Sequence, residues 1–176
     1  MPAVTPHPFA GGDDATSGNL NTVVDAALQL QGRTPGTGGA LDFYLGYNSA
    51  GTSVGATATV LIQATEVVDT AAGHTPSTGR YTVQQDGYVD VDAAAQFPSN
   101  GSAGRRILEV KNNGASVTGV SLIDIENNAD TGNSTALNVS GLVPVAAGDY
   151  LELFGTVGTG TAVSVKSRFS VKWRHV

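Results

Sequence analysis

The sequence predicts an all-β domain built as an antiparallel two-sheet sandwich, and three observations lead to this class. Hydrophobic residues make up 40% of the 176 residues and charged residues 14%, so the chain can form a core. From Ala40 onward, apolar and polar residues alternate with a period of two, as in half-buried strands. Gly, Asn, Asp and Ser cluster between these runs, where they supply the turns of a sandwich or barrel.

An extended arm and one short α-helix are expected before the sandwich. Residues 1–16 are rich in Pro and Gly and show no period. Residues 17–32 have apolar residues at helical spacing, and Gly32 is placed to end the helix. At about 13 residues this helix is marginal alone in water, so its apolar face must be buried against something. That face consists of Leu20, Val23, Val24, Ala27 and Leu28.

The Gly-rich segment Arg33–Gly39 is expected to act as a hinge between two regions. Residues 1–39 are interpreted as an anchoring segment of arm, helix and hinge, and residues 40–176 as the β domain. Eight or nine strands at this spacing, without a second helix, are typical of a two-sheet sandwich. The expected strands are residues 40–47, 57–68, 79–84, 87–97, 104–112, 117–127, 135–145, 148–157 and 162–175.

The last strand has the clearest alternation, which predicts one buried and one polar face. A strand of this length is expected to lie in the centre of its sheet, because an exposed flat edge would promote aggregation. The apolar face reads Val163, Val165, Ser167, Phe169, Val171, Trp173 and His175. The polar face carries Lys166, Arg168, Lys172 and Arg174.

The strand at residues 87–97 has two carboxylates on its polar face, Asp90 and Asp92. With a basic strand face elsewhere in the domain, they are expected to form ion pairs across strands or across subunits. Exposed pairs of this kind contribute only about 0–1 kcal/mol each, so they would set register more than stability.

Composition excludes several classes of protein. The absence of Cys rules out disulfides and Cys-ligated zinc. No apolar run approaches the roughly 20 residues of a membrane span, and the N-terminus does not resemble a secretory signal peptide. A net charge of -6 disfavours nucleic acid as a partner. The basic strand face is therefore interpreted as solvated or as facing acidic partners, with a phosphate-binding stripe as the less favoured alternative. Neither nucleic acid nor membrane is expected as a partner.

No catalytic residue, metal site or cofactor is predicted. The residues His7, His74 and His175 have no nucleophile or carboxylate at informative spacing and are interpreted as surface residues. A glycosidase pair at Asp90 and Asp92 is less favoured than salt bridging. The carboxylates and amides of Asp124–Asp130 could hold a structural Ca²⁺, although aspartates in such loops more often form turns; this alternative stays open.

Aromatic and apolar residues at alternating positions are expected in the core or at a trimer interface, with a carbohydrate-stacking platform as the alternative. The residues assigned to the core or trimer interface are Tyr88, Tyr150, Phe154, Phe169, Val171 and Trp173.

Four segments carry a resemblance to a known family: GRYTVQQDGYVDVDAAAQF, GRRILEVKNNG, LNVSGLVPVAAGDYLELF and SRFSVKW. Their shared features are the Gly87–Tyr88 strand entry, an Asn113–Gly114 hairpin, an Ala147–Asp149 turn and the final strand with Phe169. Together, over residues 57–176, they resemble the jelly-roll domain of the complement globular-head and tumour necrosis factor superfamily. The resemblance implies a jelly-roll sandwich that assembles as a homotrimer, with apolar and aromatic side chains of the inner strands at its centre.

The N-terminal segment FAGGDDATSGNLNTVVDAALQL resembles the start of small tail or virion-surface proteins of phages of actinobacteria. This resemblance implies a non-enzymatic structural protein of the virion, located on the particle as a head decoration or minor tail protein. Residues 1–32 would attach the trimer to other capsid or tail proteins. The alternative is a carbohydrate- or receptor-binding module that recognises a glycan on the host surface.

Overall fold

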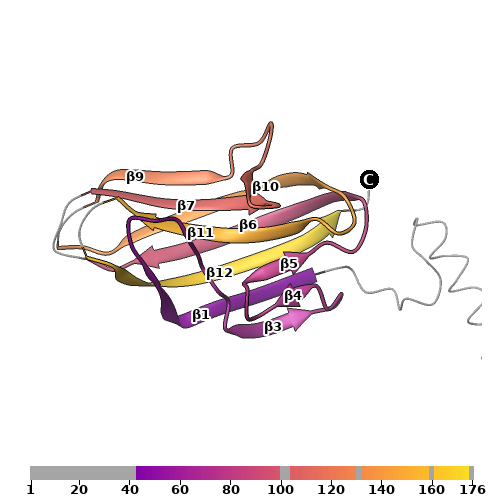
Figure 1. Cartoon of the computed structure of the whole chain (residues 1–176), viewed down its shortest axis with the longest axis horizontal. Helices are drawn as coiled ribbons and strands as arrows, with labels where there is room; N and C mark the ends of the chain where they lie inside the picture. The colour runs from indigo at the N-terminus through magenta and orange to yellow at the C-terminus, as the bar shows by residue number, and fades with distance from the viewer. Residues whose placement is uncertain (1–42, 100–103, 130–131, 159–160, 175–176) are drawn as a thin grey trace, which may run out of the picture. The chain divides into compact units, whose positions relative to one another are not determined.

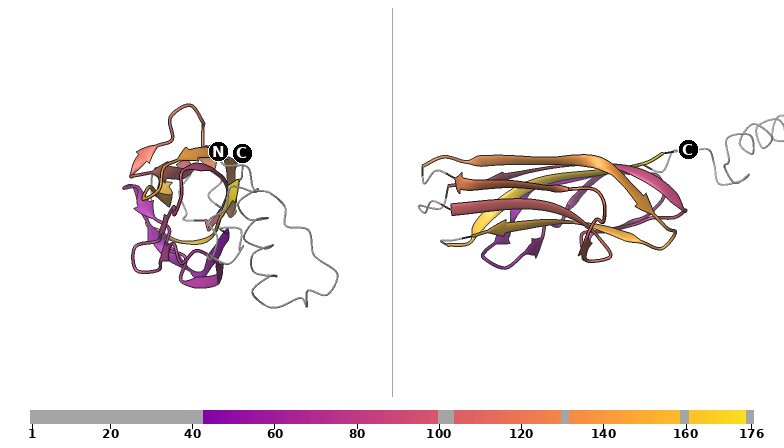
Figure 2. Two further views of the ribbon diagram at one scale, coloured as in Figure 1. Left: turned by 90° about the vertical axis from the view of Figure 1, so that its right-hand side faces the viewer. Right: turned by 90° about the horizontal axis from the view of Figure 1, so that it is seen from above.

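The computed structural model describes residues 43–99, 104–129, 132–158 and 161–174, which form two antiparallel sheets (Figure 1). The predicted two-sheet sandwich is therefore confirmed for the body. The helix predicted with Leu20, Val23, Val24, Ala27 and Leu28 lies outside the described residues and stays a prediction, as does the boundary at residue 39. Long strands of both layers run roughly along one direction (Figure 2).

The strands of the described residues are β1 (Phe43–Val54), β2 (Thr59–Val60), β3 (Thr65–Asp69), β4 (His74–Thr75), β5 (Arg80–Thr82), β6 (Gly87–Phe97), β7 (Gly104–Asn112), β8 (Ala115–Ser116), β9 (Ile123–Ala129), β10 (Thr135–Val145), β11 (Tyr150–Val157) and β12 (Val163–Arg174).

One sheet has five strands in the order β10-β6-β12-β1-β3. The last strand, β12, lies at its centre between β6 and β1, as its long alternating pattern predicted (Figure 1). The other sheet has seven strands, with β4-β5-β11-β7-β8 as its main path. Its β2 pairs with β11, and its β9 pairs with β7.

The core lies between the two sheets and is formed mainly by the inward-facing positions of β1, β6, β7, β10, β11 and β12. The burial of β12 alternates strictly from Val163 to Val171, which confirms the predicted apolar face for these positions. The rings of Tyr44 and Phe169 meet edge to face with centroids 6.2 Å apart, and neither is exposed. Burial raises the pKa of the Tyr44 phenol above its usual range, with smaller contributions from nearby carboxylates.

Two of the predicted strands are wrong in their limits. The strand expected at residues 57–68 is two strands, because the chain leaves the seven-stranded sheet after β2 and joins the five-stranded sheet at β3. The strand expected at residues 117–127 begins only at Ile123. In addition, β1 continues through the predicted turn at residues 48–55, where the register shifts between Asn48 and Thr52.

The turns at one end of the sandwich are joined through the Asp149 carboxylate. It accepts hydrogen bonds from the backbone N–H of Ala146 at 2.9 Å and from the side-chain amides of Asn112 at 3.2 Å and Asn113 at 2.7 Å. Asn113 and Gly114 both have positive φ, 52° and 75°, as a two-residue hairpin turn requires. Asp149 therefore connects the predicted Asn-Gly hairpin to the predicted turn before β11.

We expect Asp149→Asn to remove part of the stability that the protein has at neutral pH. The bonds to Ala146 and Asn113 lower the pKa of Asp149 below its ordinary value of 3.8. A lowered folded-state pKa gives stability that is present above the unfolded-state pKa and is lost as the pH falls through the folded-state pKa. The urea concentration at the midpoint of unfolding should decrease more between pH 7 and about pH 2 for the wild type than for Asp149→Asn. Parallel losses would contradict this role.

Candidate binding and contact surfaces

The outer face of the five-stranded sheet carries the basic side chains singled out from the sequence. Because β12 is central and alternates, Lys166, Arg168, Lys172 and Arg174 all point away from the core. Within the described residues, Lys166 and Lys172 have no carboxylate at ion-pair distance. This face therefore carries uncompensated positive charge, although the whole chain has a net charge of -6.

The two carboxylates of β6 pair with the two arginines of β12. Arg168 donates to Asp92 and Arg174 donates to Asp90, which confirms the predicted ion pairs as cross-strand pairs within one chain. Asp90 lies directly opposite Lys172, and Asp92 lies directly opposite Ser170. Each arginine therefore reaches diagonally across the strands, to a carboxylate two positions along β6 from the residue that faces the arginine in the register. Both carboxylates are thus held by ion pairs on the surface of the sheet, and they do not face each other across a groove as a glycosidase pair would.

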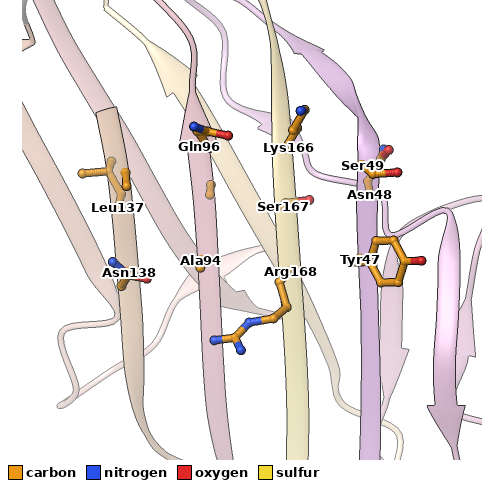
Figure 3. Close-up of a pocket in the computed structure, with 12 residues that line it drawn as sticks. Tyr47, Asn48, Ser49, Ala94, Gln96, Leu137, Asn138, Lys166, Ser167 and Arg168 are labelled. Atoms are coloured by element: carbon orange, nitrogen blue, oxygen red, sulfur yellow. The ribbon is translucent and has the colours of Figure 1, made fainter. Parts of the chain in front are cut away.

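A hollow of about 290 Å³ lies on the same outer face and spans four strands (Figure 3). It exists because Ala94 and Ala136 have short side chains between longer neighbours. Figure 3 shows the Arg168 guanidinium extending from β12 toward β6, where Asp92 holds it. The longer lining residues are Tyr47, Gln96, Asn138, Lys166 and Arg168.

The residues predicted for the core or trimer interface separate into three locations. Phe169 and Val171 lie in the core, and Trp173 packs against it. Tyr88 is exposed on the outer face of the five-stranded sheet. Tyr150 and Phe154 lie on the outer face of the seven-stranded sheet, where they are not part of that core.

The two aromatic rings of β11 are each covered by a cation. The Arg80 guanidinium lies 4.2 Å from the centroid of the Tyr150 ring, and the Lys111 ammonium lies 4.6 Å from that of Phe154. Arg80 also donates to Glu152 at 2.9 Å, and this interaction raises the pKa of the Arg80 guanidinium. A ligand that stacks on either ring would have to displace its cation, which argues against these rings as a carbohydrate platform.

The edge where β9 and β10 meet carries exposed apolar residues that the sequence reasoning missed. Ile123 and Ile125 of β9 and Leu142 of β10 are 39%, 40% and 43% exposed. We call these three residues the β9–β10 edge patch. The nearest signal in the sequence was the pair of alternating isoleucines in β9, and a strand pattern alone would favour their burial.

The orientation of β9 explains this exposure. Asp124, not its isoleucine neighbours, shares the inward side with the buried Leu108. The Asp124 carboxylate accepts the backbone N–H of Asn138 at 2.9 Å and so links β9 to β10. Leu122 packs on Gly141, where a Cβ would lie 2.7 Å from the Leu122 Cδ2 atom. The two sheets thus close on each other at this edge, with the isoleucines outside.

The structure gives a candidate metal ligand a structural role. Asp124, one of the candidate Ca²⁺ ligands, holds the edge of β10. The described part of the chain contains no cluster of three or more His, Cys, Asp or Glu side chains arranged to bind a metal ion. It also contains no helix with the length and hydrophobicity to cross a bilayer.

His74 was predicted to be a surface residue, and this is wrong. Its side chain is fully buried, with its ring 4.5 Å from that of Tyr44 and its Nδ1 3.3 Å from the Glu66 carboxylate. The backbone N–H of His74 donates to the Asp69 carboxylate at 2.7 Å. This hydrogen bond closes the loop between β3 and β4. His7 and His175 lie outside the described residues.

The fold was compared with those of known proteins. No protein-family model matches the chain, and no curated protein matches its sequence. Among solved structures, it is similar to the globular domain of zebrafish complement 1qA protein, with a TM-score of 0.62, 14% identity, and coverage of 76% of this chain and 96% of that one. It is also similar to murine APRIL, with a TM-score of 0.54, 11% identity, and coverage of 76% and 100%. The body of this chain therefore has the jelly-roll fold of the complement globular-head and tumour necrosis factor type.

Proposed function

We propose that this protein is a non-enzymatic structural component of a bacteriophage virion. In this proposal it forms a homotrimer of jelly rolls on the particle surface, as a head decoration or minor tail protein, and residues 1–32 anchor it. The fold supports the trimer, because the resemblance to the complement and tumour necrosis factor type implies threefold assembly. The phage assignment rests on the resemblance of the N-terminal segment.

The exposed apolar side chains carry the argument for self-association. Of the large apolar residues that are exposed in the described part of the chain, Ile123, Ile125 and Leu142 form the β9–β10 edge patch. Tyr88 lies one strand further in on the five-stranded sheet. On the opposite side of this sheet, Val67 lies on the edge strand β3 and Tyr47 on its neighbour β1. Exposed apolar side chains near two edges of the sandwich are candidates for protein contacts, because exposed apolar surface often marks such contacts.

Two different apolar edges on one molecule suit a closed ring. In a trimer with threefold symmetry, each copy uses one surface to contact a different surface of the next copy. The β9–β10 edge patch of one copy and the β1–β3 side of the next provide such a pair. An isologous dimer would need a single self-complementary patch instead.

Exposed β strands at these edges also need protection. The edge strand β10 is long, and an unpaired edge of this length is a template for aggregation. Pro144 on β10 and the Asp124 bond to Asn138 restrict pairing along it. Packing of this edge against a neighbouring copy would cover the remainder.

The proposed function is tested by removing residues 1–32 from the chain in the phage. We expect the shortened protein to be absent from purified particles but to remain a trimer, with a native mass three times that of the shortened chain and below three times the 17.8 kDa of the full chain. A second variant replaces Leu20 and Val24 with Ser in the full-length chain. It should also reduce incorporation, because it disrupts the apolar face of the predicted helix without shortening the chain. Unchanged incorporation would contradict the anchor, and a monomeric mass for the full-length chain would contradict the trimer.

A further inference from the structure

We propose that the hollow on the outer face of the five-stranded sheet binds an acidic saccharide. The ligand carboxylate would pair with Lys166, and its ring hydroxyls would bond the surrounding amides. This proposal goes beyond the structural role and does not depend on the anchor.

The charge at the hollow favours a ligand with one carboxylate. Two cations, Lys166 and Arg168, line it, but Arg168 is already bonded to Asp92. Lys166 has no carboxylate partner among the described residues, so one positive charge is available. A phosphate group would be better matched by an unpaired arginine with bidentate geometry, which this hollow does not offer.

The neutral side chains of the hollow favour hydroxyl groups on the same ligand. Gln96 on β6 lies directly opposite Lys166 on β12, and Asn138 on β10 lies directly opposite Ala94 on β6. Their amides have no hydrogen-bond partner among the described residues, so each offers donors and an acceptor. Hydroxyls on a sugar ring can use both roles of an amide, whereas a simple carboxylate can only accept.

The shape of the hollow fits a small cyclic ligand. Its volume of about 290 Å³ lies just below the range for small-molecule sites, which starts at roughly 300 Å³, so only a small ligand fits. Ala94 and Ala136 allow a ring to approach the sheet surface closely. Longer side chains at these two positions would fill the hollow without entering the core, because both alanines point outward.

The position of the hollow keeps it apart from the start of the domain. The chain enters β1 at Phe43, which pairs with Lys172. Lys166 lies on β12, six residues from Lys172, which corresponds to about 20 Å at the usual rise per residue. A particle-bound molecule held through its N-terminal segment would thus have this site well away from the point of chain entry.

The test is a nuclear magnetic resonance titration of the full-length, isotope-labelled protein with D-glucuronate, D-glucose and acetate. We expect glucuronate to bind at least about tenfold more tightly than either glucose or acetate, since only it combines charge with hydroxyls. Lys166→Gln should weaken glucuronate binding about tenfold, and Ala136→Leu should abolish it. Lys172→Gln is the matched control, because this lysine is on the same strand face but outside the hollow, and it should have no effect.

Several results would overturn the proposal. Equal affinity for glucuronate and glucose would exclude recognition of the carboxylate, and equal affinity for glucuronate and acetate would exclude recognition of the ring. Equal losses for Lys166→Gln and Lys172→Gln would indicate unspecific charge attraction. A change of native mass on Lys166→Gln would show that a second copy of the chain occupies the hollow. The mass of the wild type reports separately on the proposed trimer.

Discussion

Phe169→Ala should lower the free energy of unfolding by about 3–5 kcal/mol, the largest stability effect expected for a single substitution here. Phe169 is fully buried at the centre of β12. Its paired neighbours are Gly46 on β1 and Ala93 on β6, which are too small to fill the space that the ring would leave. Because the site cannot collapse easily, the cost should fall in the upper part of the range for large-to-small substitutions.

The matched control is Phe154→Ala, which removes the same atoms from the outer face of β11. Phe154 is only half-buried and contacts Lys111, so its loss should cost less than half as much. Urea unfolding of all three proteins at one fixed protein concentration measures the difference, since association would otherwise shift apparent stability. Similar losses for both variants would contradict the placement of Phe169 in the core.

The features of the fold that were predictable from the sequence depend on local pattern. The alternation in β12 identified its buried face because one face of a strand in a sandwich meets the core at every second residue. The Asn113–Gly114 hairpin was predictable because few residues adopt two consecutive positive φ values. Ion pairs of Asp90 and Asp92 with a basic strand face were predictable from charge, but the choice between pairs across strands and pairs across subunits came from the structure.

The features that were not predictable depend on which sheet a strand joins. Residues 57–68 read as one strand, but β2 pairs with β11 and β3 pairs with β1, so the chain changes sheets between them. A period of two is the same in both sheets and gives no sign of the change. The burial of His74 was missed for a similar reason, because the sequence does not show that β4 places this residue against Tyr44.

The candidate surfaces were only partly predictable. The basic face was visible in the sequence, but the hollow was not, since it depends on Ala94 and Ala136 lying on strands from distant parts of the chain. In β9 the isoleucines would have been placed inside, whereas the structure buries the Asp124 side and exposes them. Positions where pattern and structure disagree in this way are often functional. This disagreement is one reason for assigning the β9–β10 edge patch to a subunit contact.

Ile125→Lys should therefore dissociate the proposed trimer, raising the concentration for half-dissociation by at least about 100-fold. On a free chain the new ammonium would stay in water, because Ile125 is 40% exposed and lies on the outer face beside Ile107. In the trimer it would be buried against a neighbouring copy without an assigned partner, and desolvation of an unpaired charge is costly. The substitution should thus weaken assembly while leaving the fold of each chain intact.

Thr156→Lys is the control for this prediction, because Thr156 lies on the other side of Ile107 in the same row of the seven-stranded sheet. It introduces the same charge two strands away from the edge, about 10 Å from Ile125, and should leave the trimer intact. Sedimentation equilibrium over a range of concentrations measures the mass of each variant, and circular dichroism checks that the chains remain folded. If Ile125→Lys remains trimeric at every concentration, the β9–β10 edge patch is not a subunit contact. If both variants dissociate equally, the outer face of the seven-stranded sheet, and not its edge, lies at the interface.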